Sequence, residues 1–202
     1  MNSRPTALAV LIAFLIALVA PAPVVAFDPE QTFAKGTIVV SGEGAYGWQF
    51  DLEDNRDFSA LEFWDASVRF AMLPFEPLGK GSPLYGALEV GLGPLYQRYV
   101  EPPRRFWAGL SAVARYHFLS LGRVVPYIEV AGSAGGTNLN LPEIRSDFAF
   151  LIFGGAGASV FFSDKTAAYA GYRWQHVSNG NTSRPNRGFE SNVAVLGLSL
   201  FF

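Results

Sequence analysis

The chain has 202 residues, of which half are hydrophobic and only 16% are charged, and its formal net charge is −2. This charge gives no indication of a nucleic-acid partner. The sequence contains no cysteine, which excludes disulfide bonds, thiol chemistry and thiolate metal sites. Such an apolar composition is unusual for a soluble exported domain of this size.

The first 26 residues have the pattern of a secretory signal peptide. Arg4 precedes an apolar run over residues 7–20, and small residues lead up to Ala26. The run is too short to span a bilayer comfortably, because a spanning helix needs about 20 apolar residues. We therefore expect residues 1–26 to be a signal peptide and residues 27–202 to form the mature protein.

No later segment has a long uninterrupted apolar run, although half of the chain is hydrophobic. Inside a bilayer every backbone N–H and C=O must be paired within the protein, and apart from helices only a closed β-barrel achieves this. The sequence therefore predicts a membrane protein that spans the bilayer with strands.

Eight segments alternate in polarity with period two, as strands of such a barrel do. They are residues 36–50, 61–73, 84–100, 105–119, 126–138, 148–162, 167–179 and 190–202. The expected turns are residues 74–83, 120–125 and 163–166, and the longer polar connections are residues 51–57, 101–104, 139–147 and 180–189. Eight is the smallest even strand number of bacterial barrels, so we predict an all-β, eight-stranded antiparallel up-and-down transmembrane β-barrel. Residues 27–202 are expected to form this one outer-membrane β-barrel domain.

Residue parity separates the two faces of these strands, because successive side chains point to opposite sides. Even positions are apolar and are expected to face lipid. Odd positions carry four acids and three bases, and an eight-stranded barrel encloses room only for side chains. We expect these groups to pair with one another in a filled interior, which argues against a porin. They are Glu43, Asp65, Arg69, Glu89, Arg115, Glu129 and Arg173.

The final strand ends on Phe202, and this terminal aromatic resembles the insertion signal of bacterial outer-membrane barrels. If both termini are periplasmic, the connection over residues 180–189 faces the outside of the cell.

Several polar residues break the parity rule at the outer ends of strands, where ionisable groups cost least. Glu62 and Arg98 are interpreted as residues at the level of the lipid headgroups, without chemistry. The other exceptions lie on the last two strands, and they are His176, Ser178, Glu190 and Asn192.

His176 and Ser178 project to the same face, and Glu190 begins the next strand across the hairpin. If His176 lies opposite Glu190, their Cβ atoms are about 4.5–5.5 Å apart, within reach of a hydrogen bond between the side chains. An acid, a base and a hydroxyl in one row are the groups that nucleophilic acyl transfer requires. The other histidine, His117, has odd parity and is expected to form hydrogen bonds in the interior.

The segment from His176 to Glu190, HVSNGNTSRPNRGFE, resembles the PagL family of lipid A 3-O-deacylases. It shares the His-x-Ser-Asn motif, a Pro-Asn-x-Gly loop and a Glu at the same spacing. The close resemblance covers fifteen residues, and the rest of the chain is similar only in strand number and length.

By this resemblance Ser178 is the nucleophile, His176 the base and Glu190 the orienting acid. Asn186 matches an asparagine that supports the active-site loop, and the amides of Gly180 and Asn181 fall where the family places its oxyanion hole. One departure is that the family commonly has a small residue followed by Gly after Ser-Asn, whereas here Gly180 precedes Asn181.

Turn chemistry is the alternative interpretation of the asparagines, because Asn tolerates left-handed backbone and caps loops. For Asn186 the functional interpretation has an edge, whereas for Asn179 the two are balanced. Gly188 is interpreted as a residue that supplies a positive φ in the same loop.

The resemblance implies a serine esterase that faces the outer leaflet and removes the ester-linked 3-hydroxyacyl chain at position 3 of lipid A. Its partners would be lipid A or lipopolysaccharide and outer-membrane lipids. The alternatives are a non-enzymatic structural or adhesive barrel, and an acyltransferase or phospholipase barrel. No cofactor is expected, and two histidines of opposite parity without cysteine argue against a structural zinc site. The oligomeric state, including a homodimer, is left open.

Two pairs of arginines are candidates for contacts with the lipid A phosphates. Arg104 and Arg105 flank one outer connection, and Arg184 and Arg187 lie in the active-site loop. The alternative is that all four are ordinary interfacial arginines.

Overall fold

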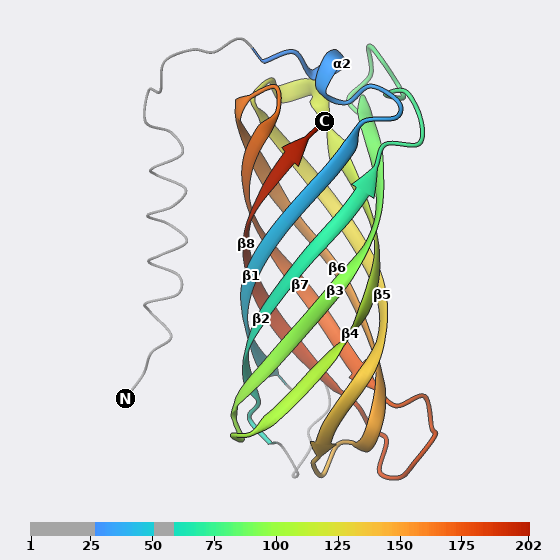
Figure 1. Ribbon diagram of the computed structural model, residues 1–202, viewed down its shortest axis with the longest axis vertical. Coiled ribbons are helices and arrows are strands. Elements are labelled where there is room, and N and C mark those ends of the chain that lie inside the picture. The colour runs from blue at the N-terminus through green and yellow to red at the C-terminus, as the bar shows by residue number, and fades with distance from the viewer. Residues whose placement is uncertain (1–26, 51–58) are drawn as a thin grey trace.

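The protein is a closed barrel in which each strand pairs with its sequence neighbours and the first strand pairs with the last (Figure 1). The computed structural model describes residues 27–50 and 59–202. Its elements are α2 (Pro29–Thr32), β1 (Ile38–Phe50), β2 (Glu62–Met72), β3 (Gly86–Glu101), β4 (Arg105–Phe118), the 3₁₀ helix η1 (Leu119–Leu121), β5 (Val124–Asn140), β6 (Arg145–Ser163), β7 (Thr166–Ser178) and β8 (Phe189–Phe201). The predicted eight-stranded antiparallel barrel is confirmed.

Two predicted segments, the signal peptide (1–26) and the connection over 51–57, lie outside the described residues. None of the helices formed by residues 27–50 and 59–202 is both long and apolar enough to cross a membrane.

The connection predicted over residues 139–147 is wrong. β5 and β6 continue to pair beyond a register shift between Gly136 and Leu139, through Leu139↔Ser146 and Asn140↔Arg145. The connection is shorter than predicted because apolar residues around it are buried, including Leu141 and Ile144. The segment that looked like a polar loop is therefore a hairpin end packed into the mouth of the barrel.

Side-chain burial confirms the predicted parity. Even-numbered Trp64 and Leu198 are 59% and 58% exposed, whereas odd-numbered Phe63 and Val193 are 0% exposed. The exterior is therefore an apolar surface and the interior is filled with side chains, which is the arrangement a barrel in a bilayer requires.

Buried ion pairs join the strands across the middle of the interior. Arg173 donates to Glu43 from Nη1 at 2.6 Å and to Glu129 from Nε at 2.7 Å. Arg115 donates to the other Glu129 oxygen from Nη2 at 2.8 Å. The predicted pairing of acids with bases is thus found in the interior.

A second group of buried charges lies around Glu89. Its carboxylate binds Arg69 Nε at 3.0 Å and His117 Nε2 at 2.9 Å, so His117 has the interior hydrogen-bonding role predicted for it. Asp65 departs from the prediction, because it accepts a hydrogen bond from the Gln97 amide at 3.2 Å instead of pairing with an arginine.

The end of the barrel that carries α2 and the C-terminus is sealed by the N-terminal segment (Figure 1). Phe33 is 0% exposed and packs against the rings of Phe161, Phe201 and His117. Asp28 caps α2 by accepting from the Glu30 amide at 3.0 Å. The connection between β7 and β8 lies at the opposite end, which we call the loop end.

Candidate active site

His176 and Glu190 form a hydrogen-bonded pair at the loop end of the barrel. They are direct register partners on β7 and β8, as the sequence led us to expect. His176 Nδ1 lies 2.9 Å from Glu190 Oε1, and the two side chains are 26% and 23% exposed. A carboxylate that accepts from Nδ1–H fixes the imidazole tautomer and leaves Nε2 free to act as a base.

Ser178 lies on the same strand face as His176, two residues closer to the loop, and its register partner on β6 is Phe150. Its hydroxyl makes no hydrogen bond within residues 27–50 and 59–202. Catalytic hydrogen bonds are often long in the absence of substrate and tighten when it binds. Trp174 lies on the same face of β7, two residues farther from the loop than His176. Its ring is nearly parallel to the imidazole, with centroids 6.3 Å apart and 18° between the planes.

A tight turn follows the strand that carries His176 and Ser178. Gly180 and Asn181 have φ angles of 62° and 63°, and Thr182 N donates to Asn179 O at 3.3 Å. Two consecutive positive φ values are those of a type I′ turn, which Gly and Asn favour. Among the described residues, no acceptor binds the backbone N–H of Gly180 or Asn181, so both amides are available to a ligand.

Asparagine side chains join the two ends of the β7–β8 loop. The Asn179 backbone N–H donates to Asn186 Oδ1 at 2.8 Å, and Asn186 Nδ2 donates to Asn181 Oδ1 at 3.1 Å. The side-chain amide of Asn179 donates from Nδ2 to the backbone oxygen of Ser183 at 3.0 Å. The four predicted loop residues are therefore close together in space, and each asparagine restrains the backbone near Ser178.

The β5–β6 connection supports this loop through backbone hydrogen bonds that the sequence analysis missed. Glu143 O accepts from Arg187 N at 2.8 Å and from Gly188 N at 3.2 Å. Pro185 O accepts from Arg145 N at 3.2 Å. The two connections thus form one unit at the loop end.

The Glu143 side chain anchors this unit inside the barrel mouth. It is 3% exposed, and its carboxylate accepts from Ser59 N and Ser59 Oγ, both at 2.7 Å, and from Gln49 Nε2 at 3.2 Å. The signal that could have revealed it is the pair of apolar residues, Leu141 and Ile144, that flank it in an otherwise polar stretch.

Gly188 lies directly against the histidine. A Cβ atom at this position would lie 2.8 Å from His176 Cε1, 3.1 Å from His176 Nε2 and 2.7 Å from Val177 O, and its φ is 72°. A side chain here would displace the imidazole of His176 at the edge that contains Nε2, the nitrogen that is not bonded to Glu190. From the sequence, Gly188 was expected only to supply a positive φ.

We expect Gly188→Ala to reduce turnover by about 10²-fold, since a displacement of about 1 Å in a catalytic group has an effect of this size. The measurement is the rate of ester hydrolysis by the folded variant. Gly36→Ala is the matched control, because Gly36 has a φ of 90° and open space around its Cα at the other end of the barrel. Equal rates for Gly188→Ala and the control would show that the imidazole position does not depend on Gly188.

The four candidate arginines fall into two groups. Arg184 and Arg187 are exposed in the β7–β8 loop beside His176. Arg104 and Arg105 lie at the β3–β4 connection, and β3 and β4 are on the opposite side of the closed barrel from β7 and β8. The structure therefore separates Arg104 and Arg105 from the candidate triad.

A closed barrel with an apolar exterior and a filled, charged interior defines an outer-membrane β-barrel protein. A sequence model of the family described as "Lipid A 3-O-deacylase (PagL)" matches residues 42–199. The chain belongs to this PagL family, whose activity is that of an ester hydrolase.

Solved structures show the same fold. The crystal structure of the outer membrane enzyme PagL is 16% identical, with a TM-score of 0.54, and the match covers 79% of this chain and 97% of that one. Neisserial surface protein A (NspA) is 17% identical, with a TM-score of 0.56, and the match covers 83% of this chain and all of the other. No curated protein matches the sequence significantly.

Proposed function

We propose that Ser178, His176 and Glu190 perform the reaction of this family, the hydrolysis of the ester-linked 3-hydroxyacyl chain at position 3 of lipid A. The observation that carries the proposal is the His176–Glu190 hydrogen bond on the lipid-facing side, with Ser178 on the same strand face. A purely structural barrel gains nothing from an ionisable pair facing lipid, where such groups cost free energy.

The reaction would proceed in two steps with an acyl-enzyme between them. Ser178 Oγ attacks the ester carbonyl carbon while its proton passes to His176 Nε2, and Glu190 stabilises the resulting imidazolium. The same proton then leaves with the sugar hydroxyl at position 3. In the second step His176 removes a proton from water, which attacks the acyl-enzyme and releases the 3-hydroxy fatty acid and free Ser178.

The free amides of Gly180 and Asn181 are suited to bind the oxyanion that forms on the carbonyl oxygen in both steps. They belong to the turn that begins directly after Ser178 and Asn179, and they have no acceptor among the described residues. Preorganised N–H donors at the position where charge develops stabilise such a transition state.

Mass spectrometry of lipid A tests the proposed function. Gram-negative cells that produce this protein should contain lipid A lighter by one 3-hydroxyacyl chain, and cells that produce the Ser178→Ala variant should not. Transfer of the chain to another lipid, without free 3-hydroxy fatty acid, would instead indicate an acyltransferase. Loss of a phospholipid acyl chain would indicate a phospholipase, and unchanged lipids would contradict enzymatic activity.

The orientation of the site can be tested by cysteine labelling. We expect a cysteine at Ser183 to react with a water-soluble thiol reagent on intact cells, because the loop end is proposed to face outward. Cysteines at Leu198 and Val90, on the lipid-facing side, should stay shielded. The natural chain contains no cysteine that would give background labelling. Labelling at Ser183 only after lysis would place the candidate site on the periplasmic side.

Arg184 and Arg187 are expected to help hold the lipid A phosphates, because guanidinium groups bind phosphate oxygens through charge-assisted hydrogen bonds. Replacing both with Gln should weaken hydrolysis in lipid A bilayers by about 30-fold, at roughly 1 kcal/mol for each arginine. Hydrolysis of a small neutral ester is the control and should change little. An equal loss on both substrates would contradict phosphate binding.

A further inference from the structure

The lipid-facing side opposite the candidate active site contains a hollow. It lies on β2, β3 and β4, has a volume of about 330 Å³, and is lined by Ala66, Ser67, Val68, Pro94, Leu95, Tyr96, Ala108 and Gly109. Large exposed side chains surround it, including Trp64, Phe70, Leu92 and Leu110. The hollow is apolar, so it is suited to receive a hydrocarbon chain.

Pro94 explains why the hollow exists. Proline has no N–H to donate to a neighbouring strand. The pairing of β2 with β3 is interrupted beside it, because Ser67↔Leu95 is followed by Phe70↔Leu92, and the two positions between them on each strand are unpaired. Gly93 permits the close approach of the strands here, since a Cβ on it would lie 1.9 Å from Val68 O. The short side chains of Ala66 and Ala108 leave the space above these strands open.

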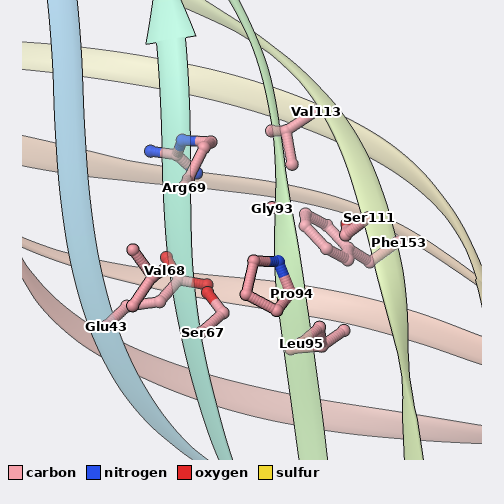
Figure 2. A pocket seen from close by; sticks show the side chains of 10 residues that line it. All are labelled: Glu43, Ser67, Val68, Arg69, Gly93, Pro94, Leu95, Ser111, Val113 and Phe153. Atoms are coloured by element: carbon pink, nitrogen blue, oxygen red, sulfur yellow. The ribbon is translucent and has the colours of Figure 1, made fainter.

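The hollow does not continue into a channel through the wall. Figure 2 shows the inner side of the same region, where Glu43, Arg69, Ser111 and Phe153 surround a gap next to Pro94. The gap has a volume of only about 10 Å³, and a single water needs at least that much. A ligand in the hollow would therefore remain on the lipid side.

An unpaired cation lies above the hollow on the same face. Arg98 follows Pro94 by four residues on β3, which is about 13 Å along the strand and about 10 Å along the membrane normal. Its cross-strand neighbours are Trp64 and Phe106. Within the part of the chain that the structure describes, the exposed Arg98 guanidinium has no hydrogen bond or ion pair.

Both basic and acidic side chains lie near Arg98, at the end of β3 and the start of β4. Arg104 is exposed in the β3–β4 turn, and Arg105 begins β4. Two acids are also close. Glu62 accepts a hydrogen bond from Tyr46 on β1, which directs it away from Arg98, and Glu101 is exposed at the turn. Arg105 has the odd parity of the interior-facing residues and its Nε is buried, so the exposed cations above the hollow are Arg98 and Arg104. Two cations at headgroup level above an apolar hollow are complementary to a phosphorylated lipid.

We propose that β2, β3 and β4 form a second, non-catalytic site for lipid A, in which Arg98 and Arg104 bind a phosphate and the hollow receives an acyl chain. Lipid A is the occupant we favour because it combines phosphates with acyl chains in the leaflet that the loop end faces. One molecule cannot occupy this surface and the candidate active site together, since the two lie on opposite sides of the barrel.

Native mass spectrometry of the full chain in detergent micelles can count the bound lipids. The protein would carry Ser178→Ala so that lipid A is not consumed during titration. We expect two lipid A molecules to bind per chain, and Arg98→Gln should weaken the binding of one of them about fivefold. Ala108→Leu, which fills the hollow from the lipid side, should weaken the same molecule. Lys35→Gln removes one exposed cation at the other end of the barrel and is the matched control.

Four results would overturn the proposal. They are a single bound lipid A in the parent protein, equal effects of Arg98→Gln and Lys35→Gln, undiminished binding of dephosphorylated lipid A, and chain dimers that replace the second lipid. The outcome is independent of the triad, because binding is counted without turnover.

Discussion

Ser178→Ala and His176→Ala should each reduce lipid A deacylation by about 10⁴- to 10⁶-fold, because each removes a group that takes part directly in the chemical step of the proposed mechanism. The measurement is release of 3-hydroxy fatty acid from lipid A in mixed micelles by variants that fold as the parent does. Both residues lie at the rim, away from the buried ion pairs, so neither substitution should prevent folding. The double variant should be little worse than either single one, since the residues act as a unit.

Glu190→Gln should leave a measurable rate, because in the proposed mechanism Glu190 orients and stabilises the imidazole without exchanging protons with the substrate. Ser191→Ala is a matched control on the same strand, and its side chain points inward. Near-parent activity in Ser178→Ala would contradict the serine mechanism and would indicate that His176 activates water directly, with Glu190 as its partner.

Arg173→Met should lower the free energy of unfolding by about 3–5 kcal/mol, the cost of removing one partner from a buried ion pair. Arg173 donates to both Glu43 and Glu129, and this substitution leaves two buried carboxylates with fewer partners. The measurement is denaturant unfolding of the reconstituted barrel, followed by tryptophan fluorescence.

The control for this substitution is Arg184→Met in the exposed loop, which should change the free energy of unfolding by less than about 0.5 kcal/mol. Adding Glu43→Gln and Glu129→Gln to Arg173→Met should recover part of the loss, because it removes the unpaired charges. If Arg173→Met costs no more than Arg184→Met, the interior ion pairs do not stabilise the barrel.

The barrel was predictable because every strand contains a repeated local signal. Large apolar side chains such as Trp64 and Leu198 recur at even positions, charged ones such as Arg173 at odd positions, and a change of parity would place charges in lipid. The ends of β5 and β6 were not predictable in this way. Their extension depends on Leu141 and Ile144 packing against side chains from other strands, which no local pattern records.

The candidate site was predictable to the same extent. β7 and β8 are consecutive strands, and His176 and Glu190 share the lipid-facing parity at their loop ends, so the two could be expected to pair, although the long loop between them does not by itself fix the register. The contact of Gly188 with the imidazole and the anchoring of the loop by Glu143 did not follow. Glu143 is more than 30 residues from His176 in the sequence, and the pairing of β6 with β7 brings the two connections together.

This joining of two connections limits how the hairpin of β7 and β8, which carries the candidate triad, can be transplanted. The amides of Arg187 and Gly188 depend on a carbonyl from the β5–β6 connection, and that connection depends on the buried Glu143 carboxylate held by Ser59 and Gln49. A chimera that moves only β7, β8 and their loop into another eight-stranded barrel would carry the triad without its support. The smallest exchangeable unit is instead β5 to β8 together with Gln49 and Ser59, so recombination between related barrels should preserve the four strands as a block.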